Sequence, residues 1–148
     1  MKNLVFIIVL CTIFSECNIN LPELKEIQFN DKAKFIYEKY KLELEPEIMQ
    51  INPGYIRFDT IEKHRININI LNAKNIPESE EELNKLASNI AYDFYSSIQN
   101  KDDFSEFVIT IIKQSSFSTG NVKMKNIYPV SFEEIEKMIE KKKNENAP

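Results

Sequence analysis

The chain has 148 residues, a net charge of −4 at pH 7 and a hydrophobic content of 43%. A nucleic-acid-binding protein normally carries a basic stripe and a high pI, so this mildly acidic balance excludes nucleic acid as the expected partner. The apolar content supports a packed core and excludes disorder of the whole chain, and the length fits one domain.

The first 17 residues have the layout of a secretory signal peptide. Lys2 leads into the apolar run Leu4–Phe14, and Ser15 and Cys17 stand at positions −3 and −1 of a cleavage site. The run is too short for a membrane-spanning helix, which needs roughly 20 apolar residues. We therefore expect a secreted or periplasmic protein from which residues 1–17 are removed. Leu4–Phe14 is expected to stand apart from the folded domain.

Cys17 also permits a second interpretation, lipid attachment at the envelope. A cysteine directly after a short apolar segment is where bacterial lipoprotein precursors are cut and acylated. Their motif has a small aliphatic residue three positions before the cysteine and Gly, Ala or Ser directly before it, whereas this chain has Phe14 and Glu16. The match is poor, and contact with a membrane is expected only if Cys17 is acylated. An uncleaved N-terminus is the third alternative.

Both cysteines, Cys11 and Cys17, lie in the segment assigned to export. The domain that begins at Asn18 would then contain no thiol and no disulfide. Cysteine proteases, zinc ribbons and thioredoxin-like redox sites are excluded together.

The first part of the domain is predicted to be helical. Pro22–Lys41 carries a loose apolar stripe, and Asn30 and Asp31 interrupt it as a second N-cap, so the segment forms one helix or two. Pro46 and the cluster Asn52–Gly54 indicate that regular structure stops there, because proline restricts the preceding residue and glycine permits a turn.

Two strands are predicted next. Tyr55–Ile61 is expected to pair with Arg65–Leu71 through a short loop at Glu62–His64. The second of these strands alternates isoleucine with asparagine, which is the period-two pattern of a half-buried strand. Its isoleucines are expected to face the core and its asparagines to face outward or toward a neighbouring strand.

A long helix and a central strand follow. Ser79 and Glu82 form a capping box, and apolar residues follow at helical spacing. Phe107–Ile112 is apolar on both faces, which is typical of a central strand. A strand, a helix and a strand in this order predict parallel pairing with a right-handed connection.

The remaining elements are a turn, a strand and a terminal helix. Ser115–Asn121 is expected to turn the chain into the strand Val122–Tyr128, and Ser131 with Glu134 forms a second capping box. The polar residues Asn144–Pro148 are expected to be a disordered tail.

The predicted fold class is α+β, with the order α-β-β-α-β-β-α after the signal peptide. We expect a mixed sheet of about four strands, helices mainly on one face and one βαβ crossover, all within a single domain at residues 18–143. The pattern predicts one shared core between six sheet residues and three helix residues. They are Ile66, Ile68, Ile70, Phe107, Ile109 and Ile111 in the sheet, and Leu86, Ile90 and Phe94 in the helix.

No motif assigns a catalytic, cofactor-binding or metal-binding residue. His64 is the only histidine, and we interpret it as a solvated loop residue rather than a general base, because no serine elbow accompanies it. The acidic residues from Glu78 to Glu82 fall in the first turn of a capped helix, where the helix dipole stabilises negative charge. Asp102 and Asp103 suit a turn.

Two weaker candidates remain. Asn72–Asn75 follows a strand at its carboxyl end, the position at which open α/β sheets bind ligands, and is the best guess for a polar pocket. Tyr92 lies far from the apolar face of the long helix and Tyr95 flanks it, so the two are a candidate interaction patch. With only two glycines in the chain, glycine-rich phosphate loops are excluded, and no cofactor is expected.

The expected function is that of an exported, non-catalytic small globular protein that binds another macromolecule at the cell envelope or outside the cell. The partner is an unidentified protein or envelope component, and the oligomeric state is not indicated. Two alternatives stay open. One is a small hydrolase or lyase that uses carboxylates alone, as glycosidases do. The other is an exported enzyme inhibitor or immunity-type protein.

Overall fold

A computed structural model describes residues 23–58, 61–117 and 120–145 of the chain. The expected signal peptide, with Leu4–Phe14 and the candidate lipid attachment site Cys17, lies outside these residues. Asn144 and Glu145, which we assigned to a disordered tail, instead belong to the last helix. That part of the tail prediction is wrong.

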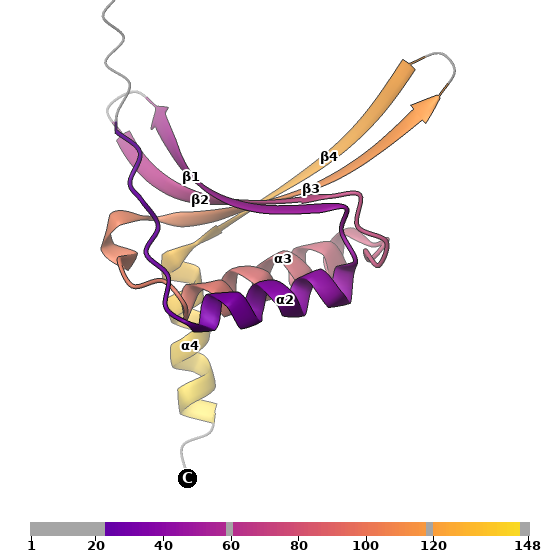
Figure 1. Ribbon diagram of the computed structural model, residues 1–148. Coiled ribbons are helices and arrows are strands. Elements are labelled where there is room, and N and C mark those ends of the chain that lie inside the picture. Colours follow the sequence, from indigo (N-terminus) through magenta and orange to yellow (C-terminus); the bar gives the residue numbers. More distant parts are fainter. Residues whose placement is uncertain (1–22, 59–60, 118–119, 146–148) are drawn as a thin grey trace, which may run out of the picture.

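The described residues form one sheet with helices packed against one of its faces (Figure 1). The fold class α+β and the element order α-β-β-α-β-β-α are confirmed. The helices are α2 (Lys32–Leu44), α3 (Glu80–Tyr95), the short 3-10 helix η1 (Lys101–Asp103) and α4 (Phe132–Glu145). The strands are β1 (Ile48–Phe58), β2 (Ile61–Leu71), β3 (Glu106–Phe117) and β4 (Gly120–Ser131).

The four strands lie in the order β1-β2-β3-β4. β1 pairs with β2 and β3 pairs with β4 in antiparallel fashion, whereas β2 and β3 pair in parallel with Ile68 opposite Ile109. The predicted parallel pairing of these two central strands, with α3 between them in the chain, is therefore confirmed. The handedness of the connection stays a prediction.

The predicted core is present between the sheet and α3. Its residues alternate along the strands and follow the helical period along α3, so that they meet across one interface. Eight of the nine predicted core residues are buried, and Leu86 is half-buried against them. α2 adds Tyr40 and Leu44 to the same core, and β4 adds Tyr128 and Val130.

The first strand begins earlier than its sequence indicates. β1 starts at Ile48, and the cluster Asn52–Gly54, which we expected to end regular structure, lies inside the strand. β1 is an edge strand that pairs with β2 alone, and an edge tolerates proline because one row of its amides bonds to no neighbouring strand. A glycine at position 54 suits the packing, because a Cβ there would collide with the side-chain amide nitrogen of Asn67.

Both hairpins are longer than predicted. Glu62–His64 belongs to β2 rather than to a loop, and most of the predicted turn Ser115–Asn121 belongs to β3 and β4. In Figure 1 the two hairpins extend past the helices and rise away from them at opposite ends of the sheet. Backbone pairing continues there because a hydrogen-bonded ladder does not require apolar side chains on both faces.

The segment before α2 is extended, so the predicted helix over Pro22–Lys41 is wrong for its described first part. Phe29 forms an isolated bridge with Ile98. The side chain of Asn100 accepts a hydrogen bond from Gln28 N at 2.9 Å and donates one to Glu26 O at 2.9 Å. These long-range bonds satisfy backbone groups that a helix would otherwise pair locally. The helix begins at Lys32, whose N–H donates to Asn30 Oδ1.

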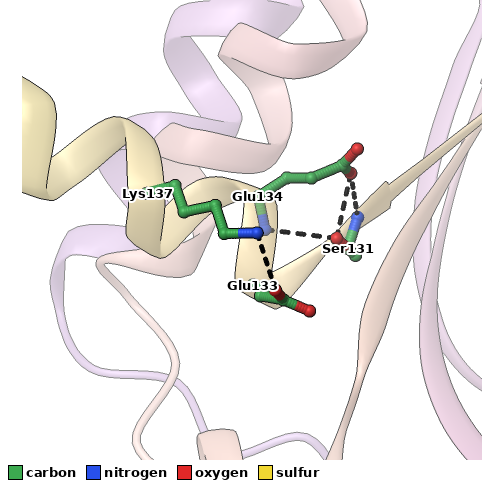
Figure 2. Close-up of polar contacts among 4 residues, drawn as sticks. All are labelled: Ser131, Glu133, Glu134 and Lys137. Carbon is green, nitrogen blue, oxygen red and sulfur yellow. Dashed lines mark hydrogen bonds and ion pairs between the residues drawn. The ribbon is translucent and has the colours of Figure 1, made fainter.

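The predicted capping box of α4 is complete, and that of α3 is present in part. At α3, Glu82 N donates to Ser79 Oγ at 3.3 Å and Ser79 Oγ donates to the Glu82 carboxylate at 2.8 Å. Figure 2 shows the second box, in which Glu134 N donates to Ser131 Oγ at 3.2 Å and Ser131 N donates to a Glu134 carboxylate oxygen at 3.0 Å. The reciprocal bonds satisfy amides that have no partner inside the helix. They start α4 immediately after β4.

The unequal burial of two α3 residues predicts unequal costs of truncation. Phe94 is fully buried and stacks on Tyr40, whereas Leu86 is only half-buried at the margin of the core. Phe94→Ala should lower the free energy of unfolding by about 3–5 kcal/mol because it leaves a cavity, and Leu86→Ala should lower it by about 1 kcal/mol. Equilibrium unfolding in urea measures both values. Equal losses at the two positions would contradict this description of the core.

Candidate functional site

The sheet face opposite α2 and α3 is covered by no helix within the part of the chain that the structure describes (Figure 1). Residues opposite each other in the strand register share a face, and successive residues alternate between faces. The core residues therefore identify which residues point away from the helices. We call the following set the open face: Ile48, Gln50, Asn52, Gly54, Arg65, Asn67, Asn69, Leu71, Glu106, Val108, Thr110, Ile112, Lys125, Ile127, Pro129 and Ser131.

One part of the open face is an apolar band. Ile48, Leu71 and Ile112 lie in one row across β1, β2 and β3, and Ile127 of β4 lies in the next row, opposite Thr110. Ile48 is 44% exposed and Ile127 is 53% exposed, although both are large aliphatic side chains. A band of this kind on an uncovered face marks a contact surface more often than isolated apolar residues do.

The other part of the open face is polar and rich in amides. Gln50 stands opposite Asn69, and Asn52 stands opposite Asn67, so four amide side chains form two adjacent rows. Each amide both donates and accepts hydrogen bonds. Such rows suit a partner that presents peptide or hydroxyl groups.

Arg65 lies at the end of these amide rows. It stands between Gly54 of β1 and Glu106 of β3, and its Nε is buried without a hydrogen-bond partner. A buried N–H that lacks a partner costs free energy.

The shape of the sheet brings its two hairpins around the open face. In Figure 1 the outer ends of β1 with β2 and of β3 with β4 rise on the side away from the helices. The open face is thus the floor between two raised ends, and a partner that lies along it would meet all four strands.

A pocket of about 420 Å³ lies on the other side of the sheet, beside the start of α3. Its lining combines apolar and polar groups. The apolar residues are Ala73, Ile76, Pro77, Leu83 and Ile111, and the polar residues are Lys74, Glu78, Lys113 and Asn126. Two residues of the predicted polar segment Asn72–Asn75 line it. The predicted polar segment therefore forms one wall of this pocket.

The segment Asn72–Asn75 also makes hydrogen bonds that connect β2 to α2 and β3. Lys74 N and Asn75 N both donate to Leu44 O, and Asn75 Nδ2 donates to Glu43 O, so the loop satisfies carbonyls at the end of α2. Asn72 has a φ of 48°, a conformation that asparagine tolerates better than most residues. Its side chain accepts a hydrogen bond from Gln114 N at 2.8 Å and donates one to Glu47.

The two tyrosines proposed as an interaction patch do not form an exposed pair. Tyr95 is only 7% exposed; its ring packs edge-on against Phe132, and its hydroxyl donates to Glu136 at 2.5 Å. Tyr92 is half-buried against the core, and Lys142 lies over its ring at 4.0 Å. The premise of exposure is wrong because α4, whose position the sequence does not reveal, folds against this side of α3.

His64 is not the solvated loop residue that we predicted. It lies within β2, is half-buried and packs against the ring of Tyr55 at a centroid distance of 5.3 Å. Its Nδ1 is buried without a hydrogen-bond partner. No hydrogen bond among the described residues joins its ring to a serine or a carboxylate, so this histidine has neither of the partners that a catalytic base needs.

Several of the acidic residues have structural roles. Glu82 completes the cap of α3, and Asp103 accepts a hydrogen bond from Asn100. Lys74 holds the pKa of Glu45 below its ordinary value, and Lys137 does the same for Glu133. A general acid requires the opposite shift. Within residues 23–58, 61–117 and 120–145, no three His, Cys, Asp or Glu side chains gather in a way that would hold a metal ion.

Comparison with known proteins adds no family assignment. The chain matches no family model, no curated protein and no solved structure. Among the described residues, no helix is long and apolar enough to cross a membrane.

The environment of Tyr95 predicts a pH-dependent contribution to stability. Burial and the hydrogen bond to Glu136 raise the pKa of Tyr95 from its ordinary value of 10.0 to about 12. The folded state therefore keeps this proton at pH values where the unfolded state loses it. The contribution should be complete below pH 10 and should disappear between pH 10 and pH 12.

Tyr95→Phe tests this assignment. We expect the variant to be less stable than the unmodified chain by about 1 kcal/mol at pH 8, and we expect the difference to shrink as the pH approaches 12. Urea unfolding at a series of pH values measures both effects. Tyr92→Phe is the matched control on the same helix, since no hydrogen bond among the described residues uses its hydroxyl. A difference that stays constant with pH would contradict the assignment.

Proposed function

We propose that this protein is an exported, non-catalytic binding protein that holds a partner protein on the open face. The observation that carries the proposal is the apolar band, with Ile48 and Ile127 exposed, beside two rows of amides on a face that no described helix covers. Covering exposed apolar area is favourable by about 25 cal/mol per Å². The amide rows would make this contact specific and fix the orientation of the partner, because each hydrogen bond needs a donor and an acceptor at defined positions.

The edges of the sheet favour contact through the face over addition of a strand. β1 carries Pro53 and β4 carries Pro129, and both strands are edges of the sheet. Proline cannot donate a hydrogen bond to an added strand, and proteins use it to block edge pairing. The partner is therefore expected to lie across the strands rather than to extend them.

The polar groups of the described residues support binding more than catalysis. Among the described residues, no hydrogen bond joins the His64 ring to a nucleophile or a carboxylate, and lysines hold the pKa values of Glu45 and Glu133 below their ordinary value. The open face, in contrast, offers the four neutral amides of Gln50, Asn52, Asn67 and Asn69. These are groups for recognition, because none of them is an efficient acid or base near neutral pH.

Site-specific photo-cross-linking in the cells that make the protein tests this proposal. A photoreactive residue at Asn69, in the middle of the open face, should yield a discrete adduct with one polypeptide, identified by mass spectrometry. The same residue at Leu42, which is 76% exposed on the outer side of α2, is the matched control and should yield no such adduct.

Charge substitutions then locate the contact. Ile127→Asp should reduce the Asn69 adduct at least about tenfold, because it places a carboxylate in the apolar band, whereas Leu42→Asp should leave the adduct unchanged. Equal adducts from both positions, or an adduct that persists in Ile127→Asp, would overturn the assignment of the open face.

The proposal that the protein is exported rests on residues 1–17 and has its own test. Mass spectrometry of the purified native protein should find a free N-terminus at Asn18. An acylated Cys17 would show lipid attachment instead, and an intact Met1 would contradict export by this signal.

A further inference from the structure

The pocket beside the start of α3 has the position and size of a small-molecule site. Its volume of about 420 Å³ falls in the usual range of ligand pockets, roughly 300–1,000 Å³. Ile111 of β3 and Ala73, which follows β2, contribute to its lining. It therefore lies at the carboxyl end of β2 and beside the middle of β3, where the parallel pairing of the two strands ends. Open sheets with parallel strands bind ligands beyond the carboxyl ends of such strands.

The inner part of the pocket is apolar. Leu83 and Ile111 are buried, and Ile76 and Pro77 are half-buried beside them. An aliphatic or aromatic group has no polar atoms that need a hydrogen-bond partner. It can therefore contact these side chains without the free-energy cost of burying an unpaired polar group. The floor therefore accepts a large apolar substituent.

The polar part of the lining carries one ammonium group and one carboxylate that have no partner. Lys74 is already paired with Glu45 at 2.9 Å. Lys113 and Glu78 are exposed, and none of the hydrogen bonds or ion pairs among the described residues uses their charged groups. A ligand with a single charge would leave one of these two groups facing a like charge or no charge. A ligand that carries both charges would satisfy both groups.

We propose that this pocket binds a free amino acid with a large apolar side chain, such as phenylalanine or leucine. The side chain would lie on Leu83 and Ile111, the carboxylate would contact Lys113, and the α-ammonium would contact Glu78. A peptide end is a poorer fit, since each end supplies only one of the two charges. The pocket lies on the opposite side of the sheet from the open face, so this inference does not depend on the proposed partner protein.

Isothermal titration calorimetry with the intact secreted protein tests the inference. L-phenylalanine and L-leucine should bind one site with a Kd between about 10 μM and 1 mM, as expected for a ligand of this size. Phenylalaninamide lacks the carboxylate and N-acetylphenylalanine lacks the ammonium group, so each should bind at least about tenfold more weakly. L-serine, which has no apolar side chain, should not bind.

Variants connect the binding to the named groups. Lys113→Gln and Glu78→Gln should each weaken phenylalanine binding about tenfold, and Ala73→Phe should abolish it by filling the pocket. Lys85→Gln and Glu81→Gln, exposed residues of α3 outside the pocket, are the matched controls and should bind as the unmodified protein does. Circular dichroism verifies that every variant is folded.

Three results would overturn the inference. The first is the absence of saturable binding with phenylalanine and leucine at concentrations up to about 10 mM. The second is equal affinity for phenylalanine, its amide and its N-acetyl derivative. The third is binding that survives Lys113→Gln, Glu78→Gln and Ala73→Phe in proteins that are shown to be folded.

Discussion

The contact between α3 and the parallel pair β2–β3 is the interaction on which the rest of the structure depends. Ile90 and Phe94 are fully buried against strand residues that are also fully buried, among them Ile68 and Ile109. Each large side chain buried in this way contributes roughly 1.5–3 kcal/mol. The contact also fixes the register of two strands that are distant in the chain, because a shift of one residue would turn every isoleucine to the opposite face.

Once these two strands are in place, the outer strands follow from short connections. β1 joins β2, and β4 joins β3, in antiparallel pairs whose registers continue without interruption. Each pair leaves an outer edge that carries a proline, which limits association through that edge. The described helices use only one side of the sheet, and none of them covers the opposite side.

The two ends of the parallel pair have different chemical character. At the carboxyl ends, Asn72 bridges β2, β3 and Glu47, and the loop that follows caps α2 and forms one wall of the pocket. At the amino ends, Ser105 N donates to His64 O and Phe132 N donates to Ser105 O, which ties β2 to the start of α4. Backbone hydrogen bonds close both ends, and the carboxyl end of β2 also has the apolar floor and the charged groups of the pocket.

Local patterns were sufficient to predict the central elements. The side-chain caps at Ser79 and Ser131, the helical period of α3 and the period-two pattern of β2 all depend on residues close together in the chain, and the structure confirms them. The position of Asn72–Asn75 beside the pocket was also predictable, because the predicted strand Arg65–Leu71 places these residues at its carboxyl end. The outward position of Asn67 and Asn69 followed from the same alternation.

Tertiary structure decided what local patterns could not. Asn52–Gly54 resembles a turn, yet it is a strand because β2 pairs with it and Gly54 leaves room for Asn67. The residues before Lys32 are extended because Asn100, far away in the chain, bonds their backbone. Tyr95 is buried because α4 packs beside α3. The open face combines side chains from four strands, so it exists only in the assembled sheet.

The sequence by itself therefore determined which segments are α3, β2 and β3 and which of their side chains form the core, because those properties arise from spacing along the chain. The extent of all four strands, the environment of His64 and the tyrosines, and the grouping of Lys113 with Glu78 in one pocket were decided only by tertiary structure. Each of these depends on contacts between residues separated by many positions, and no local pattern encodes such contacts.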